Sequence, residues 1–142
     1  MEKINAEKVP VIEGLFTLSL EDPKLIGTKC ASCETYYFPE TFSCSNPECR
    51  EKKVERCFLS RRGKLWSYTI QYYLPPPPFK TSEPFVPYGI GLVELPEKIM
   101  VLGILTESDP GKLKIGMGVE LILEKLYEEN GKEVVTWKFR PI

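Results

Sequence analysis

Histidine is absent from the 142-residue sequence. This absence removes imidazole as a general base, as the partner of a nucleophilic serine or cysteine, and as a metal ligand. Aspartate is scarce, with only Asp22 and Asp109, and the acidic residues form no recognisable catalytic constellation. We therefore expect a protein that is not an enzyme.

A surplus of positive charge is also missing. Lys and Arg number 19 against 20 Asp and Glu, which counts against a general nucleic-acid binder. No run approaches the roughly 18 apolar residues of a membrane span, and the opening "MEKINAEKVPVIEG" has no secretory-signal core. We expect a cytoplasmic protein without a membrane segment, in a compartment where thiols stay reduced.

Cysteine is what the sequence does have. Four of its five cysteines form two close pairs, Cys30 with Cys33 and Cys44 with Cys49. Both spacings are typical of structural zinc ligands, and four thiolates fill a tetrahedral site without leaving a position for substrate. Iron with the same ligands and two disulfides are the alternatives. The fifth, Cys57, is expected to be a small buried apolar residue at the start of a strand.

The segment between the pairs, "ETYYFPETFS", is aromatic and strand-like. Two short antiparallel pieces here would bring the two cysteine turns to one end, which is the arrangement of a zinc ribbon. Such a small module needs its metal, whose binding supplies on the order of 10 kcal/mol in zinc-finger peptides.

The rest of the chain alternates apolar and polar residues in about five segments. In "KLWSYTIQYYL" the alternation predicts a strand whose residues Trp66, Tyr68, Ile70, Tyr72 and Leu74 share one face. Further strands are expected over 88–95, 99–107, 119–129 and 132–139, the last two joined by a hairpin at Asn130-Gly131. Five strands fit an OB-type barrel; an SH3-like barrel or a small sandwich fits nearly as well.

We thus predict a mainly β protein in three parts. Residues 1–27 form an N-terminal arm, residues 28–56 the zinc ribbon, and residues 57–142 the five-stranded barrel. Within the arm, Val11 to Leu18 fit either a short helix, which we favour, or an extended segment. The loop "LPPPPFKTSEPFVPY" is either a stiff connector or one wall of a binding site.

The order of these parts resembles a known family, the zinc-ribbon plus OB-fold proteins first catalogued as domain of unknown function thirty-five. The matching stretches are "KCASCETYYFPETFSC", "RRGKLWSYTI", "VPYGIGLVEL", "VLGIL", "LKIGMGVEL" and "FRPI". The resemblance implies a rubredoxin-like ribbon with Cys30, Cys33, Cys44 and Cys49 as metal ligands, followed by an OB-fold barrel.

It also implies a function in lipid metabolism. Members of the family are accessory subunits that assemble with thiolases, hydroxymethylglutaryl-CoA synthase or thiolase-like aldolases and help to bind acyl-CoA. On this basis the basic residues Arg61, Arg62 and Lys64 are candidates for phosphate contacts. Aromatic residues are candidates for an apolar groove or a stacked base, namely Trp66, Tyr68, Tyr72 and Phe79. The alternative function is a single-stranded nucleic-acid binder, which the same fold and residue types also serve.

Overall fold

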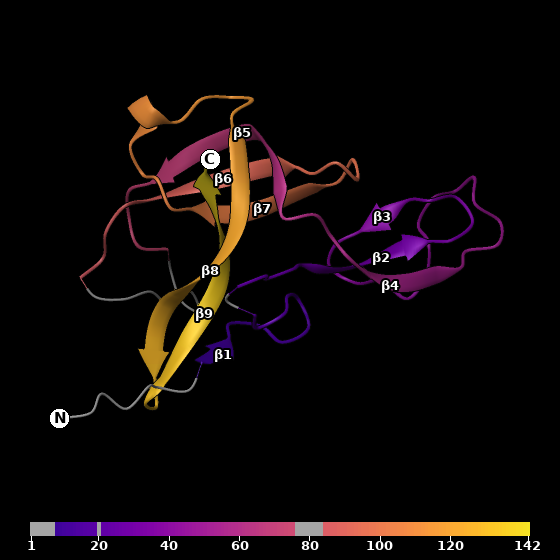
Figure 1. The fold of residues 1–142 in the computed structure, drawn as a ribbon, viewed down its shortest axis with the longest axis horizontal. Coiled ribbons are helices and arrows are strands. Elements are labelled where there is room, and N and C mark those ends of the chain that lie inside the picture. Colours follow the sequence, from indigo (N-terminus) through magenta and orange to yellow (C-terminus); the bar gives the residue numbers. More distant parts are fainter. Residues whose placement is uncertain (1–7, 20, 76–83) are drawn as a thin grey trace.

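The computed structural model describes residues 8–19, 21–75 and 84–142. Two sheets contain nearly all of the regular structure, as Figure 1 shows. The strands are β1 (Lys8–Pro10), β2 (Ile26–Cys30), β3 (Tyr36–Tyr37), β4 (Val54–Phe58), β5 (Arg62–Gln71), β6 (Tyr88–Glu94), β7 (Met100–Leu105), β8 (Gly118–Glu129) and β9 (Lys132–Pro141). A single 3-10 turn, η1 (Pro110–Lys112), lies before β8.

Strands β5 to β9 close into a barrel in the order β9-β7-β6-β5-β8, with β8 pairing back onto β9. Its pairs are antiparallel except for β7 with β9, which run parallel. This closure is that of an OB fold, so the prediction of a five-stranded barrel is confirmed. Alternation supplies the core: in β6 and β7 the inward positions are buried and include Val93, Val101 and Leu105.

The β8–β9 hairpin turns at Asn130-Gly131, as the sequence predicts. Both residues have positive φ, 54° and 76°, which is the conformation of a type I′ turn. The hairpin extends beyond the barrel wall, and β1 pairs with β9 on its far side through Lys8↔Glu133 to Pro10↔Val135.

The predicted helix from Val11 to Leu18 is wrong. No α-helix occurs in the described ranges given above, and no helix there is long and apolar enough to cross a membrane. Gly14 has φ 86°, and the backbone groups of this segment bond across the chain instead of along it. Val11 N donates to Val135 O at 2.9 Å, and Ile26 N donates to Leu15 O at 2.8 Å.

The predicted common face of β5 is also wrong. A β-bulge between Leu65 and Ser67 shifts the register against β6. Leu65 therefore points inward and is fully buried, whereas Trp66 is 55% exposed. After the bulge, Tyr68 and Ile70 pack against the core. Tyr72 and Leu74 lie beyond the end of β5 and are exposed.

The smaller sheet has the order β3-β2-β4 and lies to one side of the barrel (Figure 1). It holds the cysteine pairs, but its hairpin differs from the predicted one. Of the segment between the pairs only Tyr36–Tyr37 is a strand. It pairs with β2, which precedes the turn of the first cysteine pair. The turns of the Cys30/Cys33 and Cys44/Cys49 pairs are called the first and second knuckle below.

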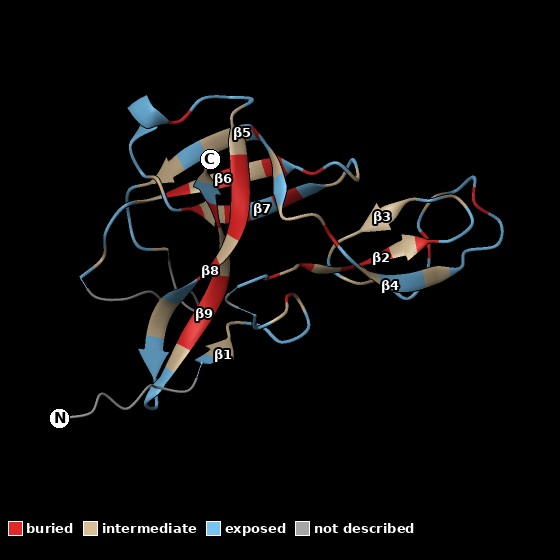
Figure 2. Ribbon diagram, viewed as in Figure 1, coloured by how far each residue is buried: buried red, intermediate tan, exposed pale blue. Residues whose placement is uncertain are grey.

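One continuous core joins the two sheets, as the run of buried residues in Figure 2 indicates. At the junction, Trp137 of β9 meets Phe16 and Phe38 edge-on at centroid distances of 5.8 and 5.9 Å. Leu25 and Leu59 are buried in the same cluster. Edge-to-face aromatic contacts of this kind fix relative orientation as well as burying area, so the ribbon is attached to the barrel by packing and not by a linker alone.

Candidate functional site

The four paired cysteines converge on one point. Cys30 ends β2, Cys33 lies in the following turn, and Cys44 and Cys49 lie in the loop before β4. Cys30 and Cys49 Sγ are 3.6 Å apart, Cys33 and Cys44 Sγ are 3.5 Å apart, and all four sulfurs lie within 4.8 Å of one another. A tetrahedron with metal–sulfur bonds of 2.3 Å has sulfur separations of about 3.8 Å. The cluster therefore fits a single four-coordinate metal ion.

The first knuckle prepares its sulfurs for the thiolate form. The Thr35 hydroxyl lies 3.2 Å from Cys33 Sγ, and this contact, with the Thr35 backbone N–H, lowers the pKa of Cys33 to about 6. The Cys33 backbone N–H likewise lowers the pKa of Cys30. Thiolates are the form that binds metal, so these hydrogen bonds favour the binding form of the first pair. In the second pair the Lys52 backbone N–H lowers the pKa of Cys49, but burial and the neighbouring sulfurs outweigh it and leave that pKa raised.

The turn of the first knuckle requires an unusual backbone conformation. Glu34 follows Cys33 with φ 62°, where rubredoxin knuckles usually have glycine. Its N–H donates to Cys30 O at 2.8 Å. A residue with a Cβ is strained in this region, and Glu34 adopts the conformation nonetheless.

The second knuckle is wider and has its own supports. Asn46 organises the turn: its side-chain oxygen accepts from Glu48 N at 3.0 Å, and its carbonyl accepts from Cys49 N at 3.0 Å. Asn46 N and Lys52 N donate to Cys44 Sγ and Cys49 Sγ, each at 3.4 Å. The Lys52 ammonium donates to Cys44 O at 2.9 Å. These N–H groups and the ammonium offset the negative charge of four thiolates.

Tyr37 is a site residue that the sequence did not reveal. Its hydroxyl is 3.1 Å from Cys44 Sγ and accepts a hydrogen bond from Ser45 N at 2.8 Å. The contact with Cys44 raises the pKa of Tyr37, so the phenol stays protonated. Because its oxygen accepts from Ser45 N, its O–H is directed at Cys44 Sγ as a hydrogen-bond donor. Such outer contacts orient metal ligands. Its sequence signal is weak, since Tyr36 and Phe38 beside it are equally aromatic.

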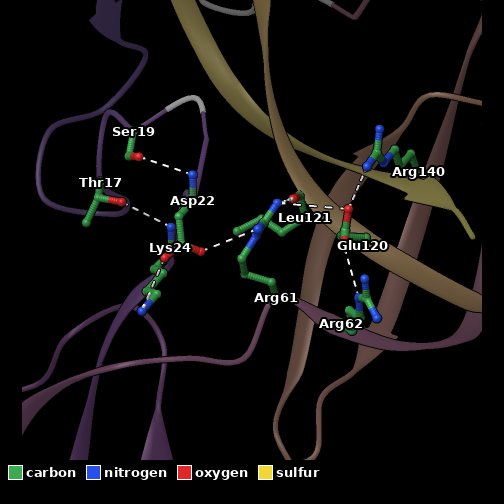
Figure 3. A network of polar contacts seen from close by, with 9 residues as sticks. All are labelled: Thr17, Ser19, Asp22, Lys24, Arg61, Arg62, Glu120, Leu121 and Arg140. Carbon is green, nitrogen blue, oxygen red and sulfur yellow. Dashed lines mark hydrogen bonds and ion pairs between the residues drawn. The ribbon is translucent and has the colours of Figure 1, made fainter.

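The basic residues proposed for phosphate lie in a network with a buried carboxylate (Figure 3). Glu120 of β8 accepts from Arg62 Nε at 2.8 Å and from Arg140 Nη2 at 2.7 Å. Arg61 donates to Leu121 O at 3.2 Å, and its guanidinium lies between two carboxylates, with Nη1 3.3 Å from Asp22 Oδ1 and Nη2 3.9 Å from Glu120 Oε1. Of the predicted residues, Arg62 is thus on the outer surface, and Arg61 connects the N-terminal arm, through Asp22, to the barrel.

The remaining predicted ligand residues are dispersed. Lys64 and Trp66 are exposed on β5, and Tyr72 is 66% exposed beyond its end. Tyr68 packs against the core, with its hydroxyl donating to Leu113 O at 3.3 Å. Phe79 lies outside the described residues.

Two adjoining pockets open on the outside of the barrel. One, of about 320 Å³, is apolar and lies between the segment that follows β1, strands β6 and β7, and the β8–β9 hairpin, with Ile12, Ile90 and Leu102 in its lining. The other, of about 310 Å³, is more polar and includes Lys125 and Lys138. They share Tyr88, Ile104 and Leu126. The alternation in β6 and β7 did not signal these pockets, because outward apolar residues read as ordinary strand positions.

Comparison with known proteins matches both halves of this architecture. Residues 19–55 fit the family model of the ChsH2 rubredoxin-like zinc ribbon domain, and residues 58–123 that of the ChsH2 C-terminal OB-fold domain. A protein of Methanocaldococcus jannaschii named DUF35 domain-containing scaffold protein is 36% identical over 121 residues, covering 83% of this chain and 82% of its own. The chain belongs to the DUF35 family.

Other members of the family carry more specific names. The benzoylsuccinyl-CoA thiolase subunit BbsA of Thauera aromatica is 32% identical, covering 84% of this chain and 78% of its own. A solved structure described as Ltp2-ChsH2(DUF35) aldolase matches with a TM-score of 0.60 and 29% identity over 83% of this chain and 84% of that one. The resemblance predicted from the sequence is confirmed, and family members include subunits of larger enzymes.

Proposed function

We propose that the chain is a non-catalytic, acyl-CoA-binding accessory subunit of a thiolase-superfamily enzyme, held in shape by a structural zinc ion. The observation that carries this proposal is the similarity, over about four fifths of both chains, to proteins named as a scaffold and as a thiolase subunit. The matches to a zinc ribbon over residues 19–55 and to an OB fold over residues 58–123 make a shared mode of assembly the simplest expectation.

The metal site supports a structural role. Four cysteine ligands occupy all positions of a tetrahedral ion, and three of them are buried. Zinc is the usual ion of closed tetrahedral four-thiolate sites with this ligand spacing, and iron is the alternative for the same ligands. When bound, the ion would contribute free energy of folding to the ribbon. The backbone of the two knuckles positions the sulfurs, and N–H groups of Asn46 and Lys52 donate hydrogen bonds to them.

The acyl-CoA part of the proposal rests on chemistry. An acyl-CoA combines phosphates with a long arm and an apolar acyl group. The barrel exposes basic side chains, Trp66 and an apolar pocket, and relatives are named for CoA thioesters.

The test is affinity capture with the tagged, zinc-loaded chain in native lysate, followed by identification of bound proteins. A thiolase, a thiolase-like aldolase or a hydroxymethylglutaryl-CoA synthase is the expected companion, and an unrelated tagged chain is the control. Calorimetry with acetyl-CoA measures the ligand part. Failure to capture a thiolase-superfamily partner, together with failure to bind acetyl-CoA, would remove the proposal. Turnover of acyl-CoA by the isolated chain would contradict its non-catalytic part.

A further inference from the structure

Three charged residues form a row across the outer wall of the barrel. Strand register places Glu120 opposite Arg62 on one side and opposite Arg140 on the other. Figure 3 shows the carboxylate between the two guanidinium groups, with both oxygens engaged. The row is therefore built by the consecutive strands β8 and β9 and by β5, which lies far from them in sequence, and its geometry is fixed by the sheet.

The row is organised but not saturated. The Glu120 side chain is only 8% exposed, whereas those of Arg62 and Arg140 are 72% and 53% exposed. Each arginine is bonded to the carboxylate through a single nitrogen, although a guanidinium carries five N–H donors. Two forks of donors thus face solvent, with their orientation held by a buried anchor.

Charge in the row favours an anion. One arginine is sufficient to neutralise Glu120, and the second leaves the row with a net positive charge. Lys64 lies two residues from Arg62 and so on the same face of β5. Strand register places Glu94 of β6 opposite it, so the net charge of the row comes from the two arginines. Arginine forks match phosphate oxygens in bidentate fashion.

The row also leads toward the apolar pocket. Lys138 lies two residues before Arg140 on β9, on the same face. It lines the more polar pocket together with Glu124, with which it is ion-paired at 3.2 Å, so this part of the surface is polar without being an anion site. That pocket adjoins the apolar one through Tyr88, Ile104 and Leu126. A path of decreasing polarity therefore runs along the outer surface from the row to the apolar pocket.

We infer that the Arg62–Glu120–Arg140 row binds the phosphate groups of a ligand whose apolar arm follows this path. The ligand class is a phosphate ester with an uncharged tail, as in an acyl-CoA. The inference rests on the acyl-CoA part of the proposed function. It assigns the phosphate groups to Arg62, which the sequence predicted, and to Arg140 and its anchor Glu120, which the sequence did not predict.

The experiment is an NMR titration of the zinc-loaded, ¹⁵N-labelled full chain with pyrophosphate and, separately, with butanoyl-CoA. Pyrophosphate is expected to shift the amide signals of Arg62, Glu120 and Arg140 and to leave the pocket unchanged. Butanoyl-CoA is expected to shift these signals together with those of Leu102 and Ile104.

The double variant Arg62→Gln with Arg140→Gln is expected to weaken butanoyl-CoA at least tenfold. Arg56→Gln is the matched control, since Arg56 is 67% exposed and paired with Glu40 at 3.0 Å on another sheet; its affinity should equal wild type. If the double variant fails to fold, Arg140→Lys keeps the charge, loses the fork and should weaken binding several-fold.

Four results would overturn the inference. The first is binding of butanoyl-CoA without a shift in the amide signals of the row, and the second is an unchanged affinity for butanoyl-CoA in the folded double variant or in Arg140→Lys. The third is a pyrophosphate-induced shift of the Arg56 amide signal as large as those of the row. The fourth is tighter binding of a short oligonucleotide than of butanoyl-CoA to the row. The first two leave acyl-CoA binding itself intact. A wild-type chain that binds no acyl-CoA removes both ligand claims, and the affinity capture then judges the partner separately.

Discussion

At the scale of single residues, the hydroxyl group of Tyr37 supports the four-cysteine cluster. The phenol donates to Cys44 Sγ and is itself held by Ser45 N. Loss of such an outer contact typically costs 10–100-fold in metal affinity. We expect Tyr37→Phe to release zinc about 10-fold or more faster to a chromogenic chelator.

The matched control for this change is Tyr36→Phe. Tyr36 precedes Tyr37 on β3, and its ring lies beneath the Lys29 ammonium at 5.5 Å instead of facing the sulfurs. Its variant should release zinc at the wild-type rate. Equal release from both variants and wild type would show that the Tyr37 hydroxyl does not support the site.

Glu34 offers a stabilising substitution. Its φ of 62° is strained for a residue with a Cβ, and glycine removes this strain at a cost of about 1 kcal/mol or less in chain entropy. With left-handed strain worth roughly 1–2 kcal/mol, Glu34→Gly should raise the unfolding midpoint of the zinc-loaded chain slightly. Glu55→Gly, in the extended strand β4, should lower it; a drop for Glu34→Gly would refute the strain.

Among the elements, the aromatic junction decides how the ribbon sits on the barrel. Phe38 comes from the ribbon and packs on Trp137 of β9. Phe38→Ala leaves a cavity there, and we expect it to lower the free energy of unfolding by about 3 kcal/mol. Denaturant unfolding measures the loss.

Phe42 provides the comparison within the same ribbon. It is fully exposed, so Phe42→Ala should change stability by less than about 0.5 kcal/mol. If Phe38→Ala were as mild as Phe42→Ala, the junction would contribute orientation without stability, contrary to the packing described above.

The barrel wall carries a pH dependence through Glu120. Hydrogen bonds from Arg62, and then from Arg140, lower the pKa of Glu120 below its ordinary value of 4.5. The folded state thus holds this carboxylate ionised more strongly than the unfolded chain does. Its contribution is present above pH 4.5 and is lost as the pH falls through the lowered folded pKa.

Glu120→Gln is therefore expected to cost about 1–2 kcal/mol at pH 7, and the difference from wild type should shrink below pH 4.5. Thermal unfolding at several pH values measures it, with exposed Glu94→Gln as control. A difference that stays constant down to pH 3 would contradict the depressed pKa.

The elements predictable from the sequence were those with local signals. Cysteine spacing located the four cysteines that converge in the ribbon, Asn130-Gly131 located the hairpin, and alternation gave the five barrel strands. β1 was missed because its partner lies on β9, about 125 residues away in the chain. The bulge at Leu65/Ser67 left no local mark, so the face of Trp66 was misassigned.

The candidate site divides in the same way. The cluster of four cysteines could be predicted because its members form short-range pairs, whereas Tyr37, Lys52 and Arg140 act through contacts that only the folded chain creates. Glu120 is a charged residue within an apolar strand, which the alternation reads as an outward position; its burial comes from the arginines of two neighbouring strands.

At the scale of the whole molecule, one core joins the small sheet beside the four-cysteine cluster to a closed barrel. The barrel has its own buried core, and the ribbon has little beyond three buried cysteines, Tyr37 and Val54. Metal removal should therefore disorder the ribbon first and leave the barrel folded.

Metal analysis of the freshly purified chain, combined with NMR before and after EDTA, tests this account most directly. We predict one zinc ion per chain and, once it is removed, loss of dispersed signals from β2, β3 and β4 while β5 to β9 keep theirs. A chain without bound metal whose ribbon signals stay dispersed in EDTA would contradict it.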